Sequence, residues 1–316
     1  MSDNHNLHLN KIIQCIFALA FVLFVVSCKT TDKVPTTKND VPQFENALLW
    51  KIEGQGLTEP SYLYGTIHLI EGDKFFWPKG TLAAFDEAEK IVFEIDMDDM
   101  FDISAQMGLL SKAFMKDNQR LSDFYSEEDY KIVSSHFDDM GIPLFFLERI
   151  KPMFLTVFAS GEIDMTAGLG GDSSVKSYEM ELYELAKQSS KDVSGLESME
   201  FQMSMFDSIP YQSQADMLLE SIKMSDVGND VFVEMEKMYQ EQRINDMIES
   251  MDEPGGVGGY EDLLLYQRNK NWIPIMGQMM KEGTVFFAVG AGHLAGKDGV
   301  LELLQTAGYT LTPLSI

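Results

Sequence analysis

Residues 61–70 read SYLYGTIHLI, an apolar run that carries a histidine near its end. Its aromatic and β-branched side chains are typical of a buried β-strand, and Gly65 permits the close approach of another backbone. The preceding stretch ALLWKIEGQG, at 47–56, has a second strand pattern, and the turn residues GLTEPS between the two predict a hairpin. A lone histidine on such a strand is more often a hydrogen-bonded core residue than a ligand, so the rest of the chain must decide the role of His68.

The chain continues with alternating helix and strand patterns. PKGTLAAFDEAEKIVFEIDM, at 78–97, predicts a short helix capped by Thr81 and then a strand. Residues 103–250 have mostly helical spacing, and a helix, an apolar strand, a helix and a last strand follow between 260 and 314. This order predicts an α/β (α+β) fold with a mixed central β-sheet, covering helices and a largely helical middle segment.

The N-terminus has the features of a secretion signal. A basic residue, Lys11, precedes an apolar run from Ile12 to Val26, which is shorter than the roughly 20 residues of a membrane-spanning helix. The run ends in VVSC, which resembles a bacterial lipobox, so Cys28 is expected to carry lipid; an uncleaved anchor helix is the alternative. We therefore predict a signal peptide at 1–27, a polar tether at 28–43 and a folded domain at 44–316. The expected location is the bacterial cell envelope, as a lipoprotein anchored in the membrane, on the periplasmic side of the outer membrane or on the cell surface.

Composition excludes several classes of function. The chain has 24 Lys and Arg against 50 Asp and Glu, a formal charge of −26. Nucleic acid and anionic lipid head groups repel such a chain, so nucleic acid is not an expected partner. The only cysteines are Cys15 and Cys28, in the signal segment and at its end. The predicted mature domain therefore has no free thiol nucleophile, disulfide or cysteine metal ligand.

Two short motifs repeat at strand ends. GTIH at 65–68 and GAGH at 290–293 each place a glycine three residues before a histidine, at the end of an apolar strand. Because functional groups gather beyond the carboxyl ends of parallel strands, His68 and His293 are expected to face one crevice. Two imidazoles and a carboxylate suit a divalent transition metal, Mn²⁺, Co²⁺ or Zn²⁺. Glu94, inside the strand IVFEIDM, is the candidate carboxylate; the alternative is a structural pair with Arg268 or with backbone donors.

Several segments together resemble the TraB/GumN family, which includes the Tiki metalloproteases. They are LLWKIEGQGLTEPSYLYGTIHLI, VFEIDM, VSGLES, YQRNKNW and FFAVGAGHLAGKDGVLELLQTAGYTLTPL, and they cover about residues 47–314. The resemblance implies a fold related to the erythromycin esterase and ChaN-like group. It also implies a metal-dependent hydrolase of the peptidase type, acting on a peptide or protein substrate.

The resemblance also assigns roles to individual residues. It implies that His68, His293 and Glu94 hold the metal, and that Arg268 and Asn269 form the family's arginine–asparagine pair. Arg268 would stabilise a developing oxyanion or orient Glu94. Glu197 in GLES, as a second acid or base, and Asp172 in GGDSS match weaker family positions, and Gln267 stands where the family often has an acidic residue. Two alternatives remain open: a non-enzymatic haem- or metal-binding lipoprotein of the cell envelope, and a catalytically inactive interaction module.

Overall fold

The computed structural model divides the chain into two compact units, each built from separate segments of the sequence. It describes residues 42–102, 108, 111–159, 175–225, 230–251 and 259–314. Within these, one unit comprises residues of 98–173 and 199–231, and the other comprises residues of 42–97, 174–198 and 232–314. The predicted signal peptide, Cys28, Asp172 and nearly all of the predicted tether lie outside the described residues.

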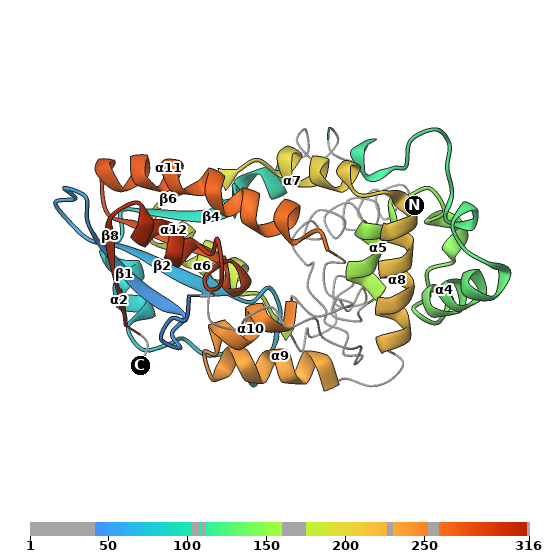
Figure 1. The fold of residues 1–316 in the computed structure, drawn as a ribbon, viewed down its shortest axis with the longest axis horizontal. Helices are drawn as coiled ribbons and strands as arrows, with labels where there is room; N and C mark the ends of the chain where they lie inside the picture. The colour runs from blue at the N-terminus through green and yellow to red at the C-terminus, as the bar shows by residue number, and fades with distance from the viewer. Residues whose placement is uncertain are drawn as a thin grey trace, which may run out of the picture. The chain divides into compact units, whose positions relative to one another are not determined.

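The second unit is organised around a six-stranded sheet with strand order β6-β4-β7-β2-β1-β8 (Figure 1). The strands are β1 (Leu49–Gly54), β2 (Ser61–Thr66), β4 (Lys90–Ile95), β6 (Asp192–Glu197), β7 (Val285–Gly290) and β8 (Tyr309–Pro313). Strands β6, β4, β7 and β2 are parallel, whereas β1 is antiparallel to both β2 and β8. The predicted mixed sheet and the predicted hairpin of β1 and β2 are confirmed.

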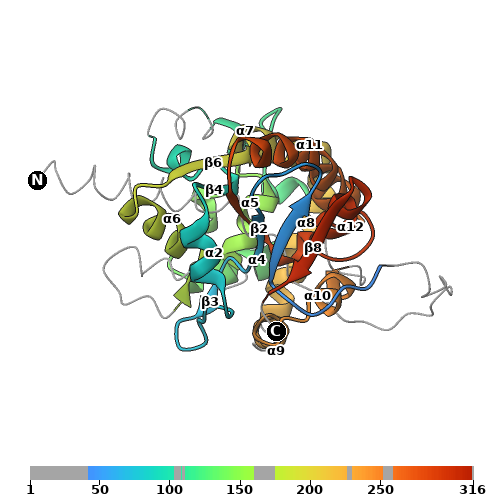
Figure 2. The same ribbon diagram turned by 90° about the vertical axis from the view of Figure 1, so that its left-hand side faces the viewer.

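Helices cover both faces of this sheet, which explains why the inner parallel strands β4, β7 and β2 are almost fully buried. α2 (Thr81–Glu87) and α6 (Tyr178–Gln188) lie on one face, and α11 (Gln267–Glu282) and α12 (Val300–Thr306) lie on the other (Figure 2). Every residue of β2 is buried, as is β7 from Val285 to Val289. The unit also contains most of α9 (Asp230–Gln240) and all of α10 (Ile244–Met251).

The start of α2 differs from the sequence prediction. Gly80, with φ 90°, is the N-cap residue, and Thr81 is the first residue of the helix and fully buried. A left-handed backbone at position 80 suits glycine, because that region is strained for residues with a Cβ. The chain therefore turns into α2 through Gly80, and the expected cap by the Thr81 hydroxyl is wrong.

A two-stranded ribbon joins distant parts of the same unit. β3 (Ile70–Glu71) pairs antiparallel with β5 (Val175–Lys176). β3 begins two residues after His68, and β5 is followed by Ser177, the N-cap residue of α6. The ribbon therefore fixes the segment that carries His68 against the first turn of α6.

The first unit is helical in its described part, as predicted for the middle of the chain. Its longer helices are α4 (Glu127–Asp139), α5 (Pro152–Ala159), α7 (Met199–Met205) and α8 (Tyr211–Ser225). An apolar core joins Leu121, Val133, Phe137, Leu155, Leu218 and Ile222. In the same unit the buried Lys151 pairs with Asp207 at 2.6 Å, which compensates its charge.

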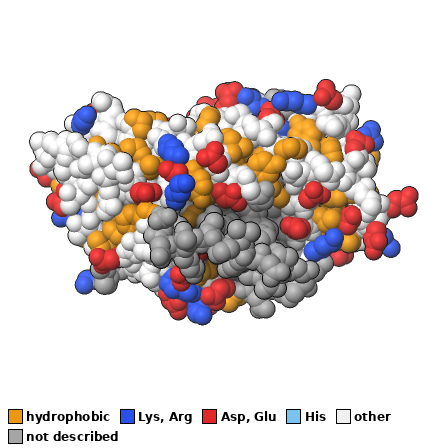
Figure 3. All heavy atoms as spheres, in the orientation of Figure 1, with side chains coloured by type: hydrophobic (Ala, Val, Ile, Leu, Met, Phe, Trp, Pro, Cys, Tyr) orange, Lys and Arg blue, Asp and Glu red, His pale blue; other side chains and the backbone are white. Residues whose placement is uncertain are grey.

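Acidic and basic side chains are mixed on the face of the molecule that Figure 3 shows. The described acidic side chains on this face lie among basic and apolar ones. Acidic residues also form local ion pairs, and Glu234, Glu241 and Asp246 all contact Arg243. Among the described residues, no helix combines the length and the apolar character needed to cross a bilayer.

Candidate metal centre

Both histidine motifs lie at the carboxyl ends of neighbouring parallel strands. β2 pairs with β7 in the register Tyr62↔Phe286 to Thr66↔Gly290. His68 follows the end of β2 by two residues, and His293 lies in the 3-10 turn Ala291–His293 directly after β7. A Cβ on Gly65 would lie 2.6 Å from Leu294 Cδ1, so the glycine of the first motif makes room for the turn that carries the second histidine. The sheet therefore brings the two motifs to one edge.

Glu94 reaches the same edge from β4, the other neighbour of β7. Glu94 is 3% exposed, and its Oε2 is paired with Arg268 Nη2. Oε1 accepts the Gly290 N–H at 2.9 Å and lies 3.6 Å from His293 Nε2. Glu94 thus makes both contacts of the structural alternative, the arginine and a backbone donor, while Oε1 still faces an imidazole.

The pKa of Glu94 reflects this surrounding. Burial raises the pKa, but the Arg268 guanidinium, with smaller contributions from His293, His68 and the Gly290 N–H, lowers it to about 2. Glu94 is therefore a carboxylate at neutral pH, as a metal ligand must be.

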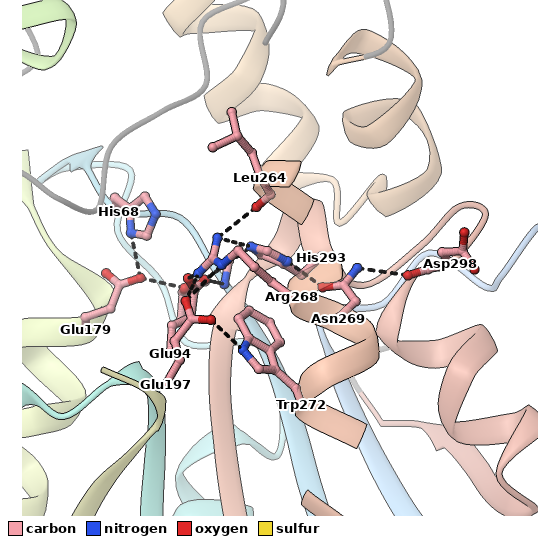
Figure 4. Close-up of polar contacts among 12 residues, drawn as sticks. His68, Glu94, Glu179, Glu197, Leu264, Arg268, Asn269, Trp272, His293 and Asp298 are labelled. Carbon is pink, nitrogen blue, oxygen red and sulfur yellow. Dashed lines mark hydrogen bonds and ion pairs between the residues drawn. The ribbon is translucent and has the colours of Figure 1, made fainter. Parts of the chain in front are cut away.

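Arg268, in the first turn of α11, connects the acidic residues of the site (Figure 4). Nε donates to Glu197 Oε1 at 2.8 Å, and Nη2 contacts both Glu94 Oε2 and Glu197 Oε1. Nη1 donates to the Leu264 carbonyl at 3.0 Å and to His293 Nε2 at 3.3 Å. These contacts involve all three nitrogens of the guanidinium. Arg268 is therefore placed to orient Glu94, and each of its nitrogens already has a partner.

Glu197 is the last residue of β6 and completes the acidic pair around Arg268. Besides Arg268, it accepts the indole N–H of Trp272 at 3.0 Å. The Trp272 ring lies 5.0 Å from the Arg268 guanidinium carbon and 4.6 Å from the His293 ring. These contacts give Glu197 an anchoring role towards Arg268, whereas its predicted role as an acid or base stays a prediction.

His293 is held as a neutral imidazole by a chain of hydrogen bonds. Asn269 Nδ2 donates to the Asp298 carbonyl at 2.9 Å, so the Asn269 carbonyl oxygen accepts from His293 Nδ1 at 2.6 Å. With the proton on Nδ1, Nε2 carries the lone pair that faces Arg268 and Glu94. Burial is the largest effect on its pKa, which is lowered to about 3 although Glu94 opposes the change. His293 is therefore a neutral imidazole at neutral pH, and its Nε2 lone pair is engaged by Arg268.

His68 has a partner that the sequence did not reveal. Its Nδ1 lies 2.9 Å from Oε1 of Glu179, a residue of the first turn of α6 that is 4% exposed. Burial raises the pKa of Glu179, but His68 and the Thr66 hydroxyl lower it below its usual value overall. In the sequence Glu179 is one acid in an amphipathic helix, and only its place two residues after the N-cap serine indicates a special position.

Gly290 lines the space on which the three proposed ligands converge. A Cβ at this position would lie 3.3 Å from Glu94 Oε1, 3.6 Å from the His293 ring and 4.0 Å from His68 Nε2. Within the described part of the chain, however, no three His, Cys, Asp or Glu side chains are close enough together to form a ready-made metal site. The donors therefore fit a metal in kind and direction, but Arg268 takes up part of their coordinating capacity.

Comparison with known proteins agrees with this arrangement. The family model of the TraB/PrgY/gumN family matches residues 48–313. The chain belongs to this family. The resemblance seen in the two Gly-x-x-His motifs is thereby confirmed over nearly the whole of the predicted domain.

Several proteins similar to this chain are metalloproteases by name. The chain is 23% identical to Metalloprotease TIKI1 of Danio rerio over 328 residues, which is 86% of this chain and 64% of that protein. It is 23% identical to Metalloprotease TIKI1 of Xenopus tropicalis over 360 residues, 94% of this chain and 68% of that protein. Metalloprotease TIKI2 of Danio rerio is 21% identical, over 90% of this chain and 63% of its own length. This chain thus spans about two thirds of the length of these relatives. No solved structure matches it.

Proposed function

We propose that this protein is a metal-dependent hydrolase, of the peptidase type, in which His68, Glu94 and His293 hold a divalent transition metal. The observation that carries the proposal is the shared direction of the two imidazoles. Each has its Nδ1 engaged by an oxygen acceptor, and the ring atoms around each Nε2 approach the space beside Gly290, next to Glu94 Oε1. Histidine ligands of metals characteristically donate their second ring N–H in this way.

The donor set matches such a metal in its chemistry. Neutral imidazoles and a carboxylate bind Mn²⁺, Co²⁺ or Zn²⁺ and leave positions open for water and substrate. Glu94 can serve two partners at once, because Oε2 is held by Arg268 while Oε1 faces His293. A cation at this place would share Glu94 with Arg268, so the metal is expected to bind more weakly than in a site without the arginine.

The chain's own residues set up the hydrolysis. When bound, the metal would lower the pKa of a water molecule and polarise the scissile carbonyl. Arg268 keeps Glu94 in place, and Glu197 and Trp272 hold Arg268 in turn. Because its N–H groups are engaged, the contacts support the orienting role of Arg268 over direct stabilisation of an oxyanion. Asn269 keeps the proton of His293 on Nδ1.

The proposed setting is the bacterial cell envelope. The basic start, the short apolar run and the sequence VVSC support lipidation at Cys28, with membrane contact through this anchor. A peptide or protein is the proposed substrate, because the similar proteins TIKI1 and TIKI2 are named metalloproteases. The haem-binding alternative gains no support from the comparisons, because the similar proteins are named metalloproteases.

Metal binding tests the proposal directly. Calorimetry with Mn²⁺, Co²⁺ and Zn²⁺ is expected to give about one site per chain in the wild type and none in the His68→Ala/His293→Ala variant. His136→Ala is the matched control, because His136 lies on α4 in the other unit. A peptide library should then be cleaved only by the metal-loaded wild type and the control. Equal metal affinity in all three proteins would refute the proposal.

A further inference from the structure

A buried carboxylate, Glu179, lies behind His68 and contacts no other proposed metal ligand in the hydrogen bonds described for it. Oε1 accepts the Thr66 hydroxyl at 2.6 Å and lies 2.9 Å from His68 Nδ1. Oε2 accepts the Ser177 hydroxyl at 3.1 Å. The carboxylate also lies in the first turn of α6, where the helix dipole favours a negative charge. Its surroundings are those of a fixed hydrogen-bond acceptor.

The fold brings this carboxylate to His68 from 111 residues away. The β3–β5 ribbon pairs Ile70 with Lys176, so the residues just after His68 lie beside those just before α6. Glu236 of α9 fixes the same segment a second time, because it accepts the Glu71 N–H at 2.7 Å. The chain just after His68 is thus held at two points, and Glu179 holds the His68 ring.

The two imidazoles of the site consequently have matched but chemically different supports. The partner of His293 Nδ1 is the neutral amide of Asn269, whereas the partner of His68 Nδ1 is a carboxylate. An acceptor-only partner requires the His68 proton on Nδ1 and leaves the lone pair on Nε2. A carboxylate partner also makes the ring more basic and therefore a stronger ligand.

We infer that Glu179 is a positioning residue that fixes the Nδ1–H tautomer of His68 and directs its Nε2 towards the space beside Gly290. The tautomer itself is independent of the proposed function, whereas its consequence for metal affinity rests on that function. Loss of the carboxylate is expected to release the ring and to weaken metal binding by about 10–100-fold, the usual scale for a support of this kind.

The tautomer can be read by nitrogen NMR of ¹⁵N-histidine-labelled protein, without metal and at alkaline pH, with His68 assigned by its absence in His68→Ala. The wild type is expected to show His68 with a protonated Nδ1 and an unprotonated Nε2. Glu179→Ala is expected to shift His68 towards the Nε2–H form that free histidine prefers. Glu179→Gln, whose amide oxygen can still accept, should retain part of the wild-type pattern and covers the case in which the alanine variant fails to fold.

Glu184→Gln is the matched control, because Glu184 lies on the same helix α6 as Glu179 but is exposed and does not contact His68 in the described hydrogen bonds. It should leave the His68 signals unchanged. Zn²⁺ calorimetry on the same proteins supplies the second readout. An Nε2–H tautomer in the wild type, or one that Glu179→Ala leaves unaltered, would overturn the inference. If the tautomer responds as expected but the wild type binds no metal, the inference stands and the proposed hydrolase fails.

Discussion

Removal of Arg268 is the perturbation that most directly probes the energetics of the site. In Arg268→Met, Glu94 and Glu197 lose the cation that they share. Water cannot replace this cation well, because Arg268 is 7% and Glu94 3% exposed. The decrease in the pKa of Glu94 from its usual 4.5 to about 2 corresponds to about 3 kcal/mol of stabilisation at neutral pH. Breaking a buried pair on one side costs about 3–5 kcal/mol in other proteins. We therefore expect the free energy of unfolding to fall by about 3 kcal/mol or more.

The pH dependence of this loss has a defined sign. In the wild type the contribution of Glu94 is complete above its unfolded-state pKa and disappears as the pH falls from 4.5 towards 2. In Arg268→Met, burial dominates and the pKa of Glu94 rises above 4.5, so the charged form destabilises the fold at pH 7. Protonation between pH 7 and 5 relieves this cost. The difference between the two proteins should therefore shrink as the pH falls.

Urea unfolding followed by tryptophan fluorescence, with a chelator present, measures this difference. Trp50, Trp77 and Trp272 all lie in the unit that contains the site, so the signal reports its unfolding. Arg243→Met is the matched control: Arg243 contacts three carboxylates but is partly exposed, so its removal should cost much less free energy of unfolding than that of the buried Arg268. A loss below about 1 kcal/mol at pH 7, or one equal at pH 7 and 5, would refute the reasoning. Glu94→Gln in the same chain should restore part of the stability.

Three further predictions concern the same residues. Gly290→Ala should keep the fold, since Gly290 has φ −52°, which residues with a Cβ also adopt. It should weaken Zn²⁺ binding in calorimetry by about tenfold or more, because the added Cβ would lie 3.3 Å from Glu94 Oε1. Full affinity would contradict the proposed position of the metal. Asn269→Ala should weaken Zn²⁺ binding by about 10–100-fold, because His293 loses its Nδ1 acceptor, and an unchanged affinity would show that the amide has no such role. The free energy of unfolding of the wild type in urea should fall as the pH decreases from 6.5 to 3, because the buried His293 resists protonation. His293→Asn should make the free energy of unfolding less dependent on pH in this range. An identical dependence in both proteins would assign the acid sensitivity to other groups.

Local patterns were sufficient to predict the sheet and its histidines. The apolar runs at β2 and β7, each followed by Gly-x-x-His, indicated buried strands, and the structure pairs these two strands in parallel. The position of Glu94 inside the apolar strand β4 also marked it as a residue that needs a partner. These predictions were confirmed because the periodicity and the polarity of a strand depend only on residues that are neighbours in the sequence.

Helix boundaries were predicted less well where backbone conformation outweighs side-chain chemistry. Thr81 has a typical capping side chain, but Gly80 takes the N-cap position with its left-handed φ, and the Thr81 side chain is buried instead. A sequence motif for a cap does not say whether the preceding residue adopts a conformation that only glycine tolerates easily.

The sequence alone determined which residue types were available for the site: two histidines after strands, a glutamate within a strand and an arginine–asparagine pair on a helix. Only the tertiary structure decided how they are coupled. Arg268 joins Glu94 and Glu197 across separations of 174 and 71 residues, and Glu179 reaches His68 across 111. Such contacts depend on strand order, on the β3–β5 ribbon and on the angle at which α6 and α11 meet the sheet. No local pattern encodes these relations, because each of them is fixed by the packing of elements that are far apart in the chain.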